Sequence, residues 1–129
     1  MTARKATSPF DASATERQRR MGLLHGDGKA NVQGIKIIAR AHAGMFFDEL
    51  CEHGDIEGGM LLTVTRLSKM QGIAEPRQIF LTICMAYDEM RLPLPDLIWW
   101  ISGSGELVSL FVKSFVDSLK TILQQIQNE

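Results

Sequence analysis

Residues 104–127 read SGELVSLFVKSFVDSLKTILQQIQ, and the apolar side chains in this stretch recur at steps of four and three. That spacing places them on one stripe of a helix, while Ser109, Lys113 and Gln124 fall on the opposite, polar side. The stripe consists of Val108, Val112, Phe115, Leu119, Ile122 and Ile126. Covering apolar surface stabilises a fold by about 25 cal/mol per Å². The stretch therefore predicts a long helix that packs across the rest of the chain, a second copy of the chain, or both.

Length and composition indicate one ordinary globular domain. The chain has 129 residues, of which 45% are hydrophobic and 22% charged, and this is enough for one core. No apolar run reaches the roughly 20 residues that cross a bilayer. Arg4 and Lys5 are not followed by an apolar segment, so no secretory signal is expected. We predict a cytoplasmic location, or one inside an assembled particle, and no membrane partner.

The predicted fold class is mainly α, a single-domain helical bundle of about four main helices. One long helix is expected to end at Gly54, and Pro76 suits the first position of another that runs to about Arg91. The alternative is an α+β fold with short strands near 33–43 and 61–66. The first of these segments alternates apolar and polar residues, and the second is rich in β-branched residues.

Turn and capping residues predict how the remaining elements are joined. Asp55 is expected to begin a helix that ends at Gly72. Pro93 and Pro95 require an extended segment, because proline removes an amide donor and disfavours helix in the residue before it. Asp96 is then expected to cap a short helical turn, and Ser104 to cap the final helix.

Charge divides the chain at about residue 30. Residues 1–30 hold six lysines and arginines against three acids, whereas the remainder holds eight against twelve. We predict a flexible basic N-terminal arm with a short helix over residues 1–30 and a globular α-rich domain over 31–129. The residues expected to bind nucleic acid or an acidic partner are Arg17, Arg19 and Arg20, since phosphate contact needs only donors on such an arm.

The candidate chemical sites do not indicate an enzyme. His42, Glu49 and His53 would form a row on one helix, but neither the His-Glu-x-x-His zinc pattern nor the Glu-x-x-His diiron pattern is present. Cys51 and Cys84 are expected to be reduced and buried, because one distant pair forms no disulfide framework. We therefore predict no catalytic residues, no metal and no cofactor.

A partner or dimer interface is expected around the two tryptophans and the start of the last helix. Trp99 and Trp100 are adjacent, so on a regular turn they cannot both point inward, and one is expected in the core while the other meets a groove or partner. Phe111 and Phe115 belong to an apolar stripe that is wider than one neighbour needs. These four residues form the predicted interface.

The leading functional hypothesis is a non-enzymatic interaction or assembly protein. It would be a homodimeric component or cofactor of a larger protein or ribonucleoprotein particle, for example a virus core, or a chaperone-like adaptor. The alternative is an accessory protein that binds RNA or DNA through the basic N-terminal arm. A second alternative is a small metal-dependent enzyme that uses His42, Glu49 and His53.

Overall fold

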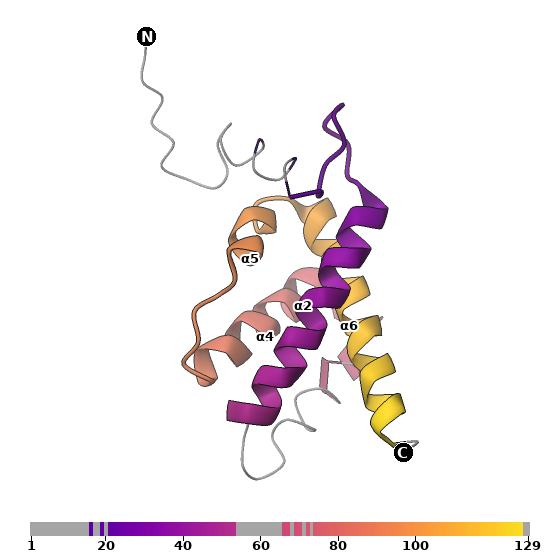
Figure 1. Ribbon diagram of the computed structural model, residues 1–129. Coiled ribbons are helices and arrows are strands. Elements are labelled where there is room, and N and C mark those ends of the chain that lie inside the picture. Colours follow the sequence, from indigo (N-terminus) through magenta and orange to yellow (C-terminus); the bar gives the residue numbers. More distant parts are fainter. Residues whose placement is uncertain are drawn as a thin grey trace.

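The computed structural model describes residues 16, 19, 21–53, 66–67, 69–70, 72 and 74–127. Within them lie four helices with defined bounds, α2 (Val32–His53), α4 (Pro76–Glu89), α5 (Asp96–Ile101) and α6 (Gly105–Gln127). Figure 1 shows α2 and α6 starting at the same end of the molecule and crossing, with α4 and the short α5 beside them. The predicted mainly α, four-helix class is confirmed.

Helix α2 decides between the two readings of residues 33–43 in favour of helix. Ile35, Ala39, Phe46 and Leu50 are all buried, and they share one helical face rather than one side of a strand. The alternation of apolar and polar residues over 33–43 suggested a strand. It did not predict the structure, because the apolar positions 39, 41 and 43 are alanines, which are strong helix formers. Residues 61–65 lie outside the described residues, and Arg66 of the second predicted strand is helical.

Helix α6 begins as predicted and buries most of its stripe. The Ser104 hydroxyl oxygen accepts a hydrogen bond of 3.2 Å from the amide of Leu107, which satisfies a free donor of the first turn. Phe111 and Phe115 are 0% and 1% exposed. Ile126 departs from the prediction at 45% exposed, and Figure 1 shows α6 and α2 diverging toward these ends. The last turn of α6 therefore has less of α2 to cover it.

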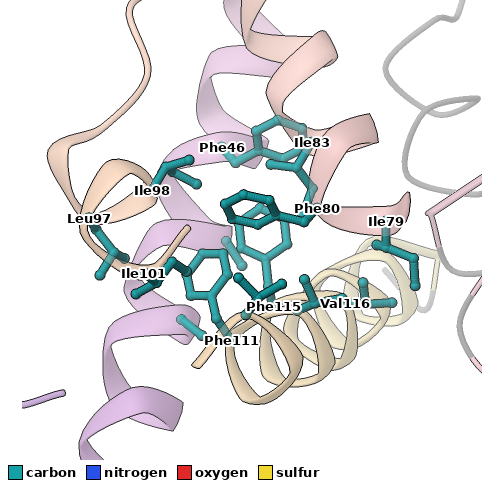
Figure 2. Packing of buried hydrophobic residues seen from close by; sticks show 14 of the residues in the cluster. Phe46, Ile79, Phe80, Ile83, Leu97, Ile98, Ile101, Phe111, Phe115 and Val116 are labelled. Atoms are coloured by element: carbon teal, nitrogen blue, oxygen red, sulfur yellow. The ribbon is translucent and has the colours of Figure 1, made fainter. Parts of the chain in front are cut away.

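The core joins all four helices around a cluster of aromatic rings. Phe46 of α2 lies between Phe115 of α6 and Tyr87 of α4, with ring centroids 5.3 Å apart in both pairs. Tilted rings at this spacing contribute attraction beyond their buried area. Figure 2 shows Ile98 and Ile101 of α5 closing the same cluster from another side.

Helix α4 has well-formed ends. Pro76 is its first residue, as predicted, and the Glu75 amide donates to Gln78 Oε1 at 3.2 Å. At the other end the Leu92 amide donates to the Tyr87 carbonyl at 3.0 Å, and the Arg91 amide donates to the Asp88 carbonyl at 2.9 Å. This pair of bonds is a Schellman motif, whose turn residue adopts a left-handed conformation that favours glycine. Here Arg91 adopts it, at a φ of 59°.

Helix α5 corrects the predicted cap. Asp96 is its first residue, and the N-cap position is occupied by Pro95, which makes no side-chain capping bond. Asp96 therefore sits in the first turn, where a carboxylate complements the positive end of the helix.

A tight turn before α2 packs onto the domain. The His25 amide donates to the Lys29 carbonyl at 2.8 Å, and Leu24 and Ala30 form an isolated antiparallel bridge. Leu23, next to this bridge, is fully buried, so the core extends back at least to Leu23. The division into an arm over 1–30 and a domain over 31–129 stays a prediction.

Gly34 allows this turn to approach α2. A side chain at Gly34 would meet the carbonyl oxygen of Gly22 and the side-chain amide of Asn31. Asn31 also caps the helix, because its Oδ1 accepts a hydrogen bond of 3.0 Å from the Gly34 amide.

Candidate functional site

The outer face of α4 carries an ordered row of exposed side chains. Arg77, Leu81, Met85 and Glu89 follow one another at steps of four, and we call this row the α4 ridge. Leu81 is 53% exposed and Met85 61% exposed, whereas Ile79, Phe80 and Ile83 of the inner face are buried. The ridge therefore has a positive end, two apolar side chains in the middle and a negative end.

The α4 ridge is connected to the exposed tryptophan of α5. One guanidinium nitrogen of Arg77 donates to the Ser102 carbonyl at 3.1 Å, and the Ser102 hydroxyl donates to the Trp99 carbonyl at 2.8 Å. Trp99 is 53% exposed. The positive end of the ridge thus helps to hold the helix that presents Trp99 to solvent.

A polar groove of about 560 Å³ lies between α2 and α6. Two cations, Lys36 and Arg40, line it from α2, and three hydroxyl side chains, Ser114, Ser118 and Thr121, line it from α6. The remaining lining residues are Asp117, Ile122 and Gln125. We refer to this feature as the α2–α6 groove.

Two titrating side chains near the core are perturbed by their surroundings. Burial, followed by the charge of Glu49 and then of Cys84, raises the pKa of Tyr87 to about 12. Burial lowers the pKa of His42, whose imidazole lies against Phe111 with the ring centroids 6.5 Å apart. Both groups are thus held in their neutral forms near neutral pH. Neither lines the α2–α6 groove.

The row of His42, Glu49 and His53, which the metal-dependent alternative would use, does not form a ligand cluster among the residues that the structure describes. His42 faces the core rather than a solvated helix end, and Glu49 lies near Tyr87. The side chain of His53 lies outside the described part. No group of three or more possible ligands converges within that part.

The two cysteines are less buried than expected. Cys51 is exposed at the outer side of α2, and Cys84 is half-buried on α4. Burial raises the pKa of the Cys84 thiol, partly offset by a backbone hydrogen bond. The expectation that both are buried was therefore wrong for Cys51. Lying within a helix does not determine whether a small residue is on its buried or its exposed side.

The four predicted interface residues fall into two groups. Phe111 and Phe115 lie inside the core of one copy, so they cannot contact a partner without unpacking it. Trp99 is exposed and Trp100 half-buried, so neither of the two tryptophans belongs to the buried core in which one was expected. Trp99 is therefore the predicted interface residue that remains accessible.

The predicted cationic site is only partly described. Arg17 and Arg20 lie outside the described residues. Arg19 pairs with Glu16 at 2.9 Å, and its backbone carbonyl accepts a hydrogen bond from the Gly22 amide. A nucleic-acid role for this arm stays a prediction.

Comparison with known proteins adds no constraint on function. No protein-family model, curated protein or solved structure matches the chain. None of the described helices has the length and apolar character to cross a membrane.

Sequence reasoning missed both the α4 ridge and the α2–α6 groove. Leu81 and Met85 lie on the side of α4 opposite its inward stripe, and their four-residue spacing is readable from the sequence. The groove joins residues some eighty positions apart, and no local pattern pairs Lys36 or Arg40 with Ser114 and Ser118.

Proposed function

We propose that the protein is a non-enzymatic interaction module that forms a homodimer through the α4 ridge and serves as an assembly component of a larger particle. The observation that carries the proposal is the order of charge and apolar surface along the ridge. Arg77 and Glu89 occupy its two ends, with exposed Leu81 and Met85 between them. Such a row is complementary to a second copy of itself.

The complementarity follows from two-fold symmetry. A two-fold axis between Leu81 and Met85 would set Arg77 of each copy opposite Glu89 of the other. In a two-fold interface every contact occurs twice, once in each direction between the two copies. Leu81 of one copy would then contact Met85 of the second copy, and the reverse. Rows at steps of four are also the ridges that interdigitate in the commonest class of helix packing.

In the proposed dimer, Trp99 adds to the interface that the α4 ridge forms. Arg77 and Ser102 hold the end of α5, and Trp99 is exposed on that helix. Tryptophan and arginine are enriched among the residues that dominate binding energy at interfaces. One ridge with one tryptophan is smaller than a standard-size interface, so we expect a dissociation constant on the order of 1–100 µM.

The test is the mass of the full chain in solution as a function of concentration. Sedimentation velocity between about 1 and about 500 µM should show a rise from the 14.4 kDa of one chain toward twice that mass. Replacing both Leu81 and Met85 with glutamate should keep the protein monomeric throughout, because four carboxylates would meet at the apolar centre of the interface.

A matched control is available on α2. Ile37 is 61% exposed and Met45 51% exposed, close to the values for the two ridge residues. The Ile37→Glu, Met45→Glu variant should dimerise like the unmodified chain. A chain that stays monomeric at every concentration would contradict the proposal, as would equal loss of dimer in the two double variants.

A further inference from the structure

The α2–α6 groove is a second surface feature, distinct from the α4 ridge. Its volume of about 560 Å³ lies within the range of roughly 300–1,000 Å³ typical of small-molecule sites. Its lining is mixed, with cationic, hydroxyl, carboxylate and amide groups and one isoleucine.

The cations and the hydroxyls of the groove come from different helices. Lys36 and Arg40 are one turn apart on α2, and Ser114 and Ser118 are one turn apart on α6. Residues at this spacing share one side of a helix. The groove therefore has two long cationic side chains on its α2 side and two short hydroxyl side chains on its α6 side.

The charges of the groove favour an anion. Within the described part of the chain neither Lys36 nor Arg40 forms an ion pair, and both are exposed at the groove. Asp117 is the one carboxylate among the lining residues, so the lining carries a net positive charge. Two cations match the charge of a phosphate monoester, which is close to a dianion at neutral pH.

The donor geometry of these side chains suits phosphate oxygens. The planar guanidinium of arginine binds two phosphate oxygens at once, and lysine adds a mobile point charge. The hydroxyls of Ser114 and Ser118 can donate to a third oxygen. The Thr121 hydroxyl already donates to the Asp117 carbonyl at 3.1 Å, so it adds acceptor capacity rather than a donor.

The same lining argues against a nucleic-acid backbone as the ligand. A polyanion needs a track of cations along its length, whereas here Asp117 lies beside the hydroxyl pair on α6. One and two turns beyond Ser118 the lining changes to Ile122 and Gln125. These two residues offer an apolar contact and an amide to whatever is esterified to the phosphate.

We propose that the α2–α6 groove binds a small phosphate monoester, with Lys36, Arg40, Ser114 and Ser118 holding the phosphate group and Ile122 and Gln125 contacting the esterified part. The site is independent of dimer formation, because none of its lining residues belongs to the α4 ridge.

The experiment is a nuclear magnetic resonance titration of the ¹⁵N-labelled full chain with inorganic phosphate, phenyl phosphate and ribose 5-phosphate. The amide signals of Ser114 and Ser118 should shift with all three probes. Phenyl phosphate and ribose 5-phosphate should also shift those of Ile122 and Gln125. Phenyl phosphate and ribose 5-phosphate should bind more weakly at pH about 5.5 than at about 7.5, because a phosphate monoester loses its second charge near pH 6.

Three variants assign the effect to the groove. Arg40→Gln should weaken binding about tenfold and Lys36→Gln about threefold, as expected for loss of a bidentate and of a single charged contact. Lys29→Gln removes an exposed cation on the turn before α2, outside the groove, and should leave the affinity unchanged.

Three outcomes would contradict the proposed phosphate site. Absence of shifts at Ser114 and Ser118 up to about 10 mM probe would overturn the proposal. Even a weak site with a dissociation constant of about 1 mM would be half filled at about 1 mM probe. Equal loss in Lys29→Gln would show a diffuse charge effect and would also overturn it. A single-stranded oligonucleotide that binds the same residues more tightly than the monoesters would replace the small-molecule site by a nucleic-acid site.

Discussion

Helices α6 and α4 treat their apolar surface in opposite ways. Most of the stripe of α6 is covered: Val108, Phe115 and Leu119, together with the neighbouring Phe111, are at most 1% exposed, and Ile126 at the end of the helix is the exception. Helix α4 buries an inner face of similar character but leaves Leu81 and Met85 more than half exposed. Helix α4 therefore leaves apolar side chains uncovered in the middle of its outer face, whereas the large apolar side chain that α6 leaves exposed, Ile126, lies in its last turn.

The difference comes from the position of each helix. Helix α6 packs against both α2 and α4, so its wide stripe is shared between two neighbours. The principal packing partner of α4 is α6, and its opposite face has no described element over it. A wide apolar stripe thus indicates a central helix, whereas a narrow row opposite the core face indicates a surface that a partner can use.

The largest expected effect comes from truncating the covered stripe. Phe115→Ala should lower the free energy of unfolding by about 3–5 kcal/mol, because it leaves a cavity beside Phe46 and Phe111. Met85→Ala, at a dilution where the chain is monomeric, should change it by less than about 0.5 kcal/mol. Urea unfolding followed by circular dichroism measures both, and comparable losses would contradict the contrast between the two helices.

The next effect compares two glycines of α2, one against the packed turn and one in open space. Gly34→Ala should destabilise by about 1–3 kcal/mol, since the new methyl group meets the Gly22 carbonyl. Gly44 has no neighbour within 4 Å, so Gly44→Ala should stabilise by about 0.5–1 kcal/mol through helix propensity. Thermal melts of the two variants should shift in opposite directions, and a shared direction would refute the close approach at Gly34.

A third effect probes the inner face of α4 through its single tyrosine. The pKa of Tyr87 is raised to about 12, above its value of about 10 in an unfolded chain, so the native state retains the proton and stability falls as pH rises above 10. Between pH 9 and 11 the loss should be about 1.4 kcal/mol. Tyr87→Phe should lack that component of the loss.

The readout for Tyr87 is direct. Tyrosinate absorbance near 295 nm should titrate with a midpoint near 12 in the folded chain and near 10 in denaturant. A folded midpoint at about 10 would mean that the inner face of α4 is open to water.

The smallest effect concerns the end of α4. Arg91 occupies the left-handed position of the Schellman motif, which costs a side-chain-bearing residue roughly 1 kcal/mol relative to glycine. Arg91→Gly should therefore raise the free energy of unfolding by about 0.5–1 kcal/mol, reduced by the greater freedom of glycine in the unfolded chain. Unfolding in urea provides the measurement, and destabilisation would show that the arginine side chain makes a compensating contact.

How much the sequence predicts can be traced to particular residues. The stripe of α6, the cap at Ser104 and the start of α4 at Pro76 were readable because each depends on local spacing or backbone chemistry. Phe111 and Phe115 were assigned to an interface from the width of the apolar stripe, but both lie in the core of one copy. The width of a stripe does not say how many neighbours within the same copy will cover it.

Other features required the tertiary arrangement. The burial of Leu23 depends on a turn folding back on α2, and the exposure of Ile126 depends on where α6 diverges from α2. The α2–α6 groove pairs residues from distant parts of the chain, so no local pattern could have indicated it.

The central claim is that two copies of the α4 ridge meet in opposite directions, and charge reversal tests it most directly. In sedimentation velocity, Arg77→Glu alone and Glu89→Arg alone should each weaken the dimer about tenfold, because each creates two like-charge contacts across the two-fold axis. The Arg77→Glu, Glu89→Arg double variant should recover the unmodified affinity. A double variant as weak as the single variants, or single variants that dimerise unchanged, would contradict the account.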